Sequence, residues 1–299
     1  MWELLPRDDK GFFLIILGDP FITSVNIVEM LLHGSLYIVA GIIAGLVSGV
    51  MGIGGGIVVV PALAFIFNHK ANFPHELVMQ MAAGTSLAVM LFTSQSSIRT
   101  HYKQGVILWS VYRRLWPGIV MGAISGALIS HKLSTFWLRM LFGFFLLFVS
   151  IKMLADMNKK EIKPYHFPPA WINGLINFVI GGIAGLLGVG GGALTVPYLS
   201  YCNLDIKKIA PISALSTLTV AAVGTVVFII TGANEPGLPM YSSGFVYWPA
   251  VLGIAIPSSF FAPLGAKLTY IIPVKQLKYG FIALLIATAI DLLILRGLF

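Results

Sequence analysis

Two stretches of the chain carry nearly the same glycine-rich sequence: GVMGIGGGIVVVPAL at residues 49–63 and GLLGVGGGALTVPYL at residues 185–199. The shared glycines and the proline recur at a constant offset of 136 positions. Glycine destabilises a helix interior by about 1 kcal/mol, so a repeated run of three requires a structural reason. A match of this kind at a fixed offset predicts an internal duplication.

The composition around these motifs predicts a membrane protein. The chain is 58% hydrophobic and only 10% charged, whereas soluble domains carry roughly 25% charged residues. Apolar stretches such as Leu141–Ala155 and Tyr279–Leu295 approach the ~20 residues that a helix needs to cross a bilayer. We therefore expect an all-α, polytopic, multi-pass protein of the cell inner membrane. A cleaved signal peptide is not expected, because Gly18, Asp19 and Pro20 interrupt the first apolar run.

The duplication predicts how the chain is organised. An N-terminal segment at 1–34 crosses the membrane or lies at its surface; the first repeat follows at 35–156, a cytoplasmic linker at 157–170, and the second repeat at 171–299. Each repeat contains a short helix pair broken by glycines and then three transmembrane helices. The expected apolar pieces are 35–51, 55–68, 76–98, 106–130 and 137–155 in the first repeat, and 171–187, 191–203, 209–232, 245–266 and 276–295 in the second.

The basic residues indicate that the two repeats are inverted. If each repeat crosses the membrane an odd number of times, most of the 19 Lys and Arg residues gather on one side, as cytoplasmic loops do. The segment 232–244 contains no Lys or Arg, whereas its counterpart at 99–114 contains four. The net charge of +8 is thus explained by topology, and no nucleic-acid partner is expected.

The triple glycines predict a turn at mid-depth in the membrane. Backbone that stops being helical there must be buried in protein or line a polar cavity. A helix that starts just after such a turn presents free N–H groups and a positive dipole end to an anion. We therefore expect an anion site at the repeat interface, built from Gly54, Gly55, Gly56, Gly190, Gly191 and Gly192. The alternative for small residues is close helix packing, which suits the pairs Gly45/Gly49 and Gly181/Gly185.

The doubled GxGGGxxxVP motif, followed by AAGTSLAVMLFTS at residues 82–94, resembles the sulfite exporter TauE/SafE family, also called toluene sulfonate uptake permeases. The resemblance extends over residues 36–295. It implies a carrier for small sulfur-containing anions such as sulfite, sulfoacetate and other sulfonates. It also places a small hydroxyl motif on Thr85 and Ser86, for which Ser216 and Thr217 are the equivalents in the second repeat. These hydroxyls would bind an anion, or alternatively bond to their own helix carbonyls.

A few further polar residues are candidates for transport. Gln95, Arg99 and Lys267 would lie in the inner vestibule, although the two basic residues also fit simple topology charges. Asp291 lies within an apolar stretch and is a candidate for ion coupling. One cysteine, Cys202, and six scattered histidines give no metal-ligand spacing, so neither a metal nor another cofactor is expected. No membrane-spanning stretch contains paired carboxylates, and the sequence has neither a nucleophile elbow nor a nucleotide-binding loop, which argues against an enzyme.

Together these features predict a secondary transporter of small sulfur-containing anions that works by alternating access, with export the favoured direction. Its partners would be the anionic substrate and membrane lipid. Import would require coupling to protons or sodium. The competing interpretations are an anion channel and a carrier for a non-sulfur organic anion such as a carboxylate. The sequence does not favour one oligomeric state over another.

Overall fold

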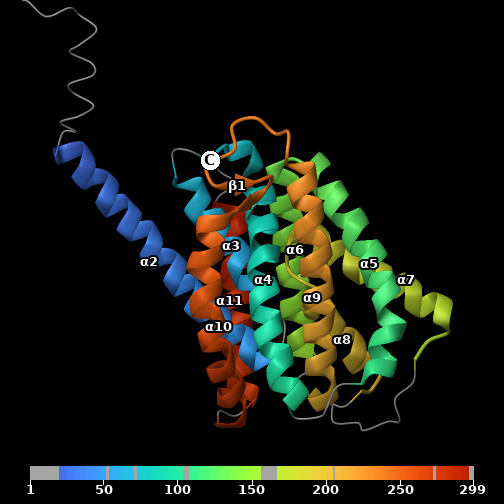
Figure 1. Ribbon diagram of the computed structural model, residues 1–299. Coiled ribbons are helices and arrows are strands. Elements are labelled where there is room, and N and C mark those ends of the chain that lie inside the picture. Colours follow the sequence, from blue (N-terminus) through green and yellow to red (C-terminus); the bar gives the residue numbers. More distant parts are fainter. Residues whose placement is uncertain are drawn as a thin grey trace, which may run out of the picture.

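A computed structural model describes residues 20–51, 54–70, 73–103, 108–155, 167–204, 206–271 and 274–295, and in these segments the chain is almost entirely helical (Figure 1). The helices are α2 (Pro20–Met51), α3 (Gly56–Asn68), η1 (His75–Leu77), α4 (Val78–Lys103), α5 (Trp109–Lys132), α6 (Thr135–Ala155), α7 (Ala170–Leu187), α8 (Gly192–Tyr201), α9 (Ile206–Thr231), α10 (Trp248–Ile271), α11 (Val274–Ile290) and η3 (Asp291–Leu295). The strands β1 (Ser242–Ser243) and β2 (Val246–Tyr247) form one short hairpin.

Each of the ten apolar pieces expected from the sequence corresponds to a helix, although several boundaries differ by a few residues. The first piece is part of α2, which begins at Pro20 and runs without a break to Met51. The expected boundary at residue 34 therefore falls inside a helix, because Gly34 alone does not interrupt helical backbone there. The helix α10 begins at Trp248 instead of residue 245, because the preceding residues form β2.

The helices are long and apolar enough to cross a membrane several times. Among the described residues, five helical segments meet that requirement: His75–Arg99, Thr135–Ala155, Ala170–Leu187, Lys208–Thr231 and Trp248–Gly265. Shorter apolar helices cover Gly34–Gly49 and Gly56–Asn68. Large apolar side chains are exposed on the outer faces of the bundle, including those of Met121, Phe144, Phe178, Val226 and Leu252. Such a surface suits lipid and confirms an all-α, multi-pass membrane protein.

The helices pack in pairs across the two halves of the sequence. The most extensive contacts are between α5 and α7, between α2 and α10, and between α4 and α9. A Cβ added to Gly84 in α4 would lie 3.1 Å from Cβ of Phe228, and one added to Gly224 in α9 would lie 2.6 Å from Cδ1 of Leu87. The start of α4 thus meets the end of α9, so these two central helices run antiparallel.

Small residues allow the other helix pairs to approach closely. A Cβ added to Gly45 would lie 2.6 Å from the carbonyl oxygen of Ser258 in α10. In the second half, a Cβ added to Gly181 would lie 2.3 Å from the carbonyl oxygen of Ile119 in α5, and one added to Gly185 would lie 2.6 Å from that of Ala123. These three glycines therefore serve backbone-to-backbone packing, as expected for glycines at this spacing.

The β1–β2 hairpin covers one end of the α4–α9 pair (Figure 1). Phe245 is fully buried, and its carbonyl oxygen would lie 2.9 Å from a Cβ added to Gly84. Tyr247 contacts the rings of Phe67 and Phe73, and its hydroxyl accepts a hydrogen bond from Lys70 at 3.2 Å. The hairpin is thereby anchored to the C-terminal end of α3 as well as to α4.

Candidate functional site

The two glycine motifs form turns, each leading into a short helix. Gly54 and Gly55 have φ values of 81° and 78°, and Gly190 has a φ of 79°. This left-handed region costs an L-amino acid with a side chain about 1–2 kcal/mol, which explains glycine at these positions. The turns differ in one respect: Gly191, the counterpart of Gly55, is right-handed with a φ of −62°. Helix α3 begins directly after the first turn, and α8 directly after the second.

The two turns lie against each other in the interior of the bundle. Gly54, Gly55, Gly56, Gly190, Gly191 and Gly192 are all buried. A Cβ added to Gly56 would lie 2.6 Å from the carbonyl oxygen of Val189 in the opposite turn. Cγ2 of Thr217 would lie 2.4 Å from a Cβ at Gly54 and 2.8 Å from one at Gly190. The fold therefore brings the six predicted glycines into one cluster, with Thr217 touching both turns.

Thr217 connects α9 to the start of α8 through a hydrogen bond. The backbone N–H of Gly192 donates to the hydroxyl of Thr217 at 2.9 Å. Because a hydroxyl can accept and donate at once, Thr217 keeps a proton for another acceptor. On the other side, Thr93 of α4 donates to the carbonyl oxygen of Gly54 at 3.3 Å. Hydroxyl side chains from both central helices thus contact the turns.

The N-termini of α3 and α8 supply further hydrogen-bond donors. The backbone N–H groups of Val58 and Val59 both point to the carbonyl oxygen of Gly55, each at 3.0 Å. The first N–H groups of any helix, here those of Gly56 and Ile57, have no acceptor within the helix. Together with the positive end of each helix dipole, these groups favour an anion.

The remaining predicted hydroxyls occupy different surroundings. Ser86 is fully buried in α4, and its hydroxyl has no hydrogen-bond partner among the described residues. Thr85 accepts a hydrogen bond from the backbone N–H of Tyr247 at 3.0 Å and lies 3.5 Å from the carbonyl oxygen of Phe245. Ser216 donates to the carbonyl of Ile212, one turn earlier in its own helix, at 3.0 Å. In this conformation Thr85 therefore fixes the hairpin, and Ser216 bonds to its own helix.

The vestibule and coupling candidates lie on three different helices, α4, α10 and η3. Gln95 and Arg99 are exposed near the C-terminal end of α4. The side chain of Lys267 falls outside the described residues. Asp291 begins η3 and lines a lateral groove of about 480 Å³, together with Thr288 of α11, Ala40 of α2 and Ala62 of α3. The lining of this groove includes neither Gln95 nor Arg99, but it reaches Val58 near the N-terminus of α3.

Sequence reasoning missed two residues of the glycine cluster, Met90 and Thr93. Both follow Ser86 on one face of α4, at spacings of four and seven residues, which place side chains on the same side of a helix. Applying that spacing to the stretch AAGTSLAVMLFTS would have identified them. Among the described residues, no three His, Cys, Asp or Glu side chains gather in a way that could hold a metal ion.

Comparison with known proteins extends this picture. A model of the sulfite exporter TauE/SafE family matches residues 37–292. The chain is 34% identical over 262 residues to a probable membrane transporter protein of Haemophilus influenzae, covering 86% of this chain and 97% of that protein. It is 32% identical to a probable membrane transporter protein of Methanocaldococcus jannaschii, covering 84% and 91% of the two chains. No solved structure matches the chain significantly.

Both relatives are described as probable membrane transporters, and neither description is that of an enzyme. The match covers both glycine turns, the helices α3 and α8 that follow them, and the central helices α4 and α9. The chain therefore belongs to the sulfite exporter TauE/SafE family and is a multi-pass membrane transporter.

Proposed function

We propose that this transporter carries small sulfur-containing anions, such as sulfite, sulfoacetate or other organosulfonates, and exports them by alternating access. The anion would bind between the two glycine turns, near the middle of the bilayer. The observation that carries this proposal is the convergence of the two turns on Thr217, with the N-termini of α3 and α8 beside it. The description of the matching family supports sulfite as the first substrate to test.

The chemistry of the cluster suits a sulfur oxyanion. Backbone N–H groups and the hydroxyls of Thr217 and Ser86 would donate to its oxygens. Such donors stabilise negative charge without placing a full positive charge in the membrane interior, which would be costly to strip of water. The main-chain cradle also requires glycine, because any side chain at Gly56 would separate the two turns.

We further propose that the two repeats are inverted and that alternating access depends on this symmetry. In support, α4 and α9 are antiparallel, and their contacts to α10 and α5 correspond to each other when the repeats are exchanged. Inverted repeats that meet at broken helices are a common basis for rocking motions around a fixed site. The domain limits in this proposal are 1–34, 35–156, 157–170 and 171–299.

The position of the hairpin supports a gate at the outer end of the transporter only. It covers the α4–α9 pair at the end where the connecting loop has no Lys or Arg, which the positive-inside rule assigns to the outside. Gln95 and Arg99 lie toward the opposite, cytoplasmic end, where Arg99 would attract anions, and we place Lys267 in the same vestibule. Export needs no coupling ion, since an inside-negative potential favours anion exit by about 2.3 kcal/mol per charge per 100 mV.

The test is counterflow in liposomes that contain the purified protein. Vesicles loaded with unlabelled sulfite should accumulate radiolabelled sulfite transiently from the outside, and acetate in place of internal sulfite should not drive this uptake. Saturating counterflow would support a carrier for sulfur anions. Currents that scale with voltage without counterflow would indicate a channel, and counterflow driven only by carboxylates would refute the proposed substrate class.

A further inference from the structure

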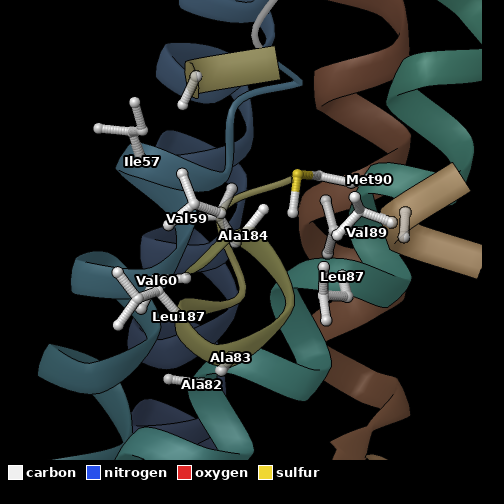
Figure 2. Close-up of a cluster of buried hydrophobic side chains, with 14 of the residues drawn as sticks. Ile57, Val59, Val60, Ala82, Ala83, Leu87, Val89, Met90, Ala184 and Leu187 are labelled. Atoms are coloured by element: carbon white, nitrogen blue, oxygen red, sulfur yellow. The ribbon is translucent and has the colours of Figure 1, made fainter. Parts of the chain in front are cut away.

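Met90 lies between the two glycine turns. Its side chain is fully buried. Its Sδ would lie 3.3 Å from a Cβ at Gly54 and 2.7 Å from one at Gly190, and its Cε would lie 2.8 Å from a Cβ at Gly56. Figure 2 shows the sulfur of Met90 directed from α4 toward the ribbon that links α7 to α8. One thioether thus touches backbone from both repeats.

This position is the one that an anion bound to both turns would need. A Cβ added to Gly56 would lie 2.6 Å from the Val189 carbonyl oxygen, so the turns touch at this point, and an anion that contacts both turns would have to take the adjoining space that Met90 fills. A thioether is only a weak hydrogen-bond acceptor, so it does not replace an oxyanion as a partner for the N–H groups. Met90 therefore fills this space with a group that is a poor partner for hydrogen-bond donors.

The nearby residue Ser86 is a second, independent indication that a ligand binds at this place. It lies one helical turn before Met90, on the same face of α4. Its hydroxyl is completely buried and has no partner within the described part of the chain. A buried hydroxyl without a partner costs free energy, which a bound oxyanion would recover.

We propose that Met90 is a displaceable plug: it occupies the substrate position in the empty transporter, and the anion must move it aside to reach both turns. This inference rests on the proposed anion site. Methionine suits such a role, because its unbranched side chain has three rotatable bonds and can repack in several ways. The plug is present in one repeat only, since the position four residues after Thr217 is Ala221.

The plug would also select substrates by size. A compact oxyanion such as sulfite needs little more than the space that the end of the methionine side chain vacates. A bulky aryl sulfonate would require the whole side chain to leave. Met90 would therefore determine specificity, with small sulfur oxyanions as the preferred class.

The experiment measures binding of sulfite, methanesulfonate, sulfoacetate and benzenesulfonate to the detergent-purified full chain and three variants. Met90→Ala should bind sulfite about tenfold more tightly, because the anion no longer has to displace a buried methionine. It should also bind benzenesulfonate. Met90→Leu conserves volume and keeps the fold, but its branched side chain repacks less easily, so sulfite should bind about tenfold more weakly.

Met81→Ala is the matched control. Met81 is also fully buried in α4, about two and a half turns before Met90. The Met81→Ala variant should have a lower melting temperature but the affinity and selectivity of the wild type for the four anions. If the wild type binds sulfite while Met90→Leu and Met90→Ala keep its affinity and size preference, the plug is refuted and the site stands. If the wild type binds none of the four anions, the proposed function is refuted and the plug with it.

Discussion

The substitution Gly54→Ala tests how tightly the two turns are fitted together. The φ of Gly54 is 81°, and holding alanine in this left-handed region costs about 1–2 kcal/mol. The new methyl group would lie 2.4 Å from Cγ2 of Thr217. Overpacking of this kind typically costs a further amount of about 1–3 kcal/mol. The free energy of unfolding should therefore fall by about 2–5 kcal/mol.

Gly174→Ala provides the matched control. Gly174 lies inside α7, and a Cβ there meets nothing within 4 Å in the described structure. Replacing glycine by alanine in a helix stabilises it by about 0.5–1 kcal/mol. Thermal unfolding in detergent should therefore shift in opposite directions for the two variants, with Gly54→Ala melting below the wild type and Gly174→Ala at or above it.

A double variant separates the two costs at Gly54. Thr217→Ser removes Cγ2 but keeps the hydroxyl that accepts from Gly192. Combined with Gly54→Ala, it should recover the overpacking part of the loss, about 1–3 kcal/mol, and leave the backbone cost. The reasoning fails if Gly54→Ala melts like the wild type, or if Thr217→Ser restores nothing.

Three other substitutions probe the surroundings of the site. Thr85→Val should lower the free energy of unfolding by about 1–3 kcal/mol, because it leaves the buried N–H of Tyr247 unpaired; unchanged melting would contradict the anchoring role of Thr85. Tyr247→Phe removes the hydrogen bond from Lys70 but keeps the ring beneath the ammonium group of that lysine. Thermal unfolding should therefore show that the free energy of unfolding falls by about 0.5–1.5 kcal/mol. A larger loss would contradict this account of how the hairpin is anchored. Asp291→Asn should abolish any stimulation of sulfite flux by a pH gradient while counterflow persists, since an amide cannot carry the proton; a retained pH response would exclude Asp291 as the coupling group.

The helices could be predicted from the sequence because lipid imposes strict rules on backbone and on length. Apolar stretches must be helical in a bilayer, so their positions follow from composition alone. The convergence of the glycine motifs also followed, since a duplicated break in a membrane helix suggests a shared site. The continuity of α2 across Gly34 could not be predicted. A single glycine in an apolar stretch is compatible both with a helix boundary and with a helix interior.

Individual side-chain roles were harder to predict than the backbone. Thr85 and Ser86 are adjacent in the sequence, yet a helix directs them to different sides. Thr85 therefore meets the hairpin, while Ser86 is buried and has no hydrogen-bond partner in the described segments. Met90 carries no polar atom that would mark it as functional. Its spacing from Ser86 places it on the same face of α4, but its contact with both turns depends on how α4 crosses α9, which is a tertiary contact.

The central claim, that a sulfur anion binds at the glycine turns, is tested most directly by ligand-induced stabilisation. A ligand that binds only the folded state must raise its apparent melting temperature. We would compare sulfite, thiosulfate, sulfoacetate, taurine, an aryl sulfonate, sulfate and acetate on the wild type, on Gly191→Leu and on the control Gly174→Ala. A Cβ at Gly191 would lie 2.9 Å from the carbonyl oxygen of Ser216, so leucine there should distort the site.

The account predicts stabilisation of the wild type and of Gly174→Ala by a sulfur anion, and none for Gly191→Leu even where that variant remains folded. Equal stabilisation of Gly191→Leu would place the anion elsewhere in the protein. No stabilisation of the wild type by any of the seven compounds would contradict the claim outright.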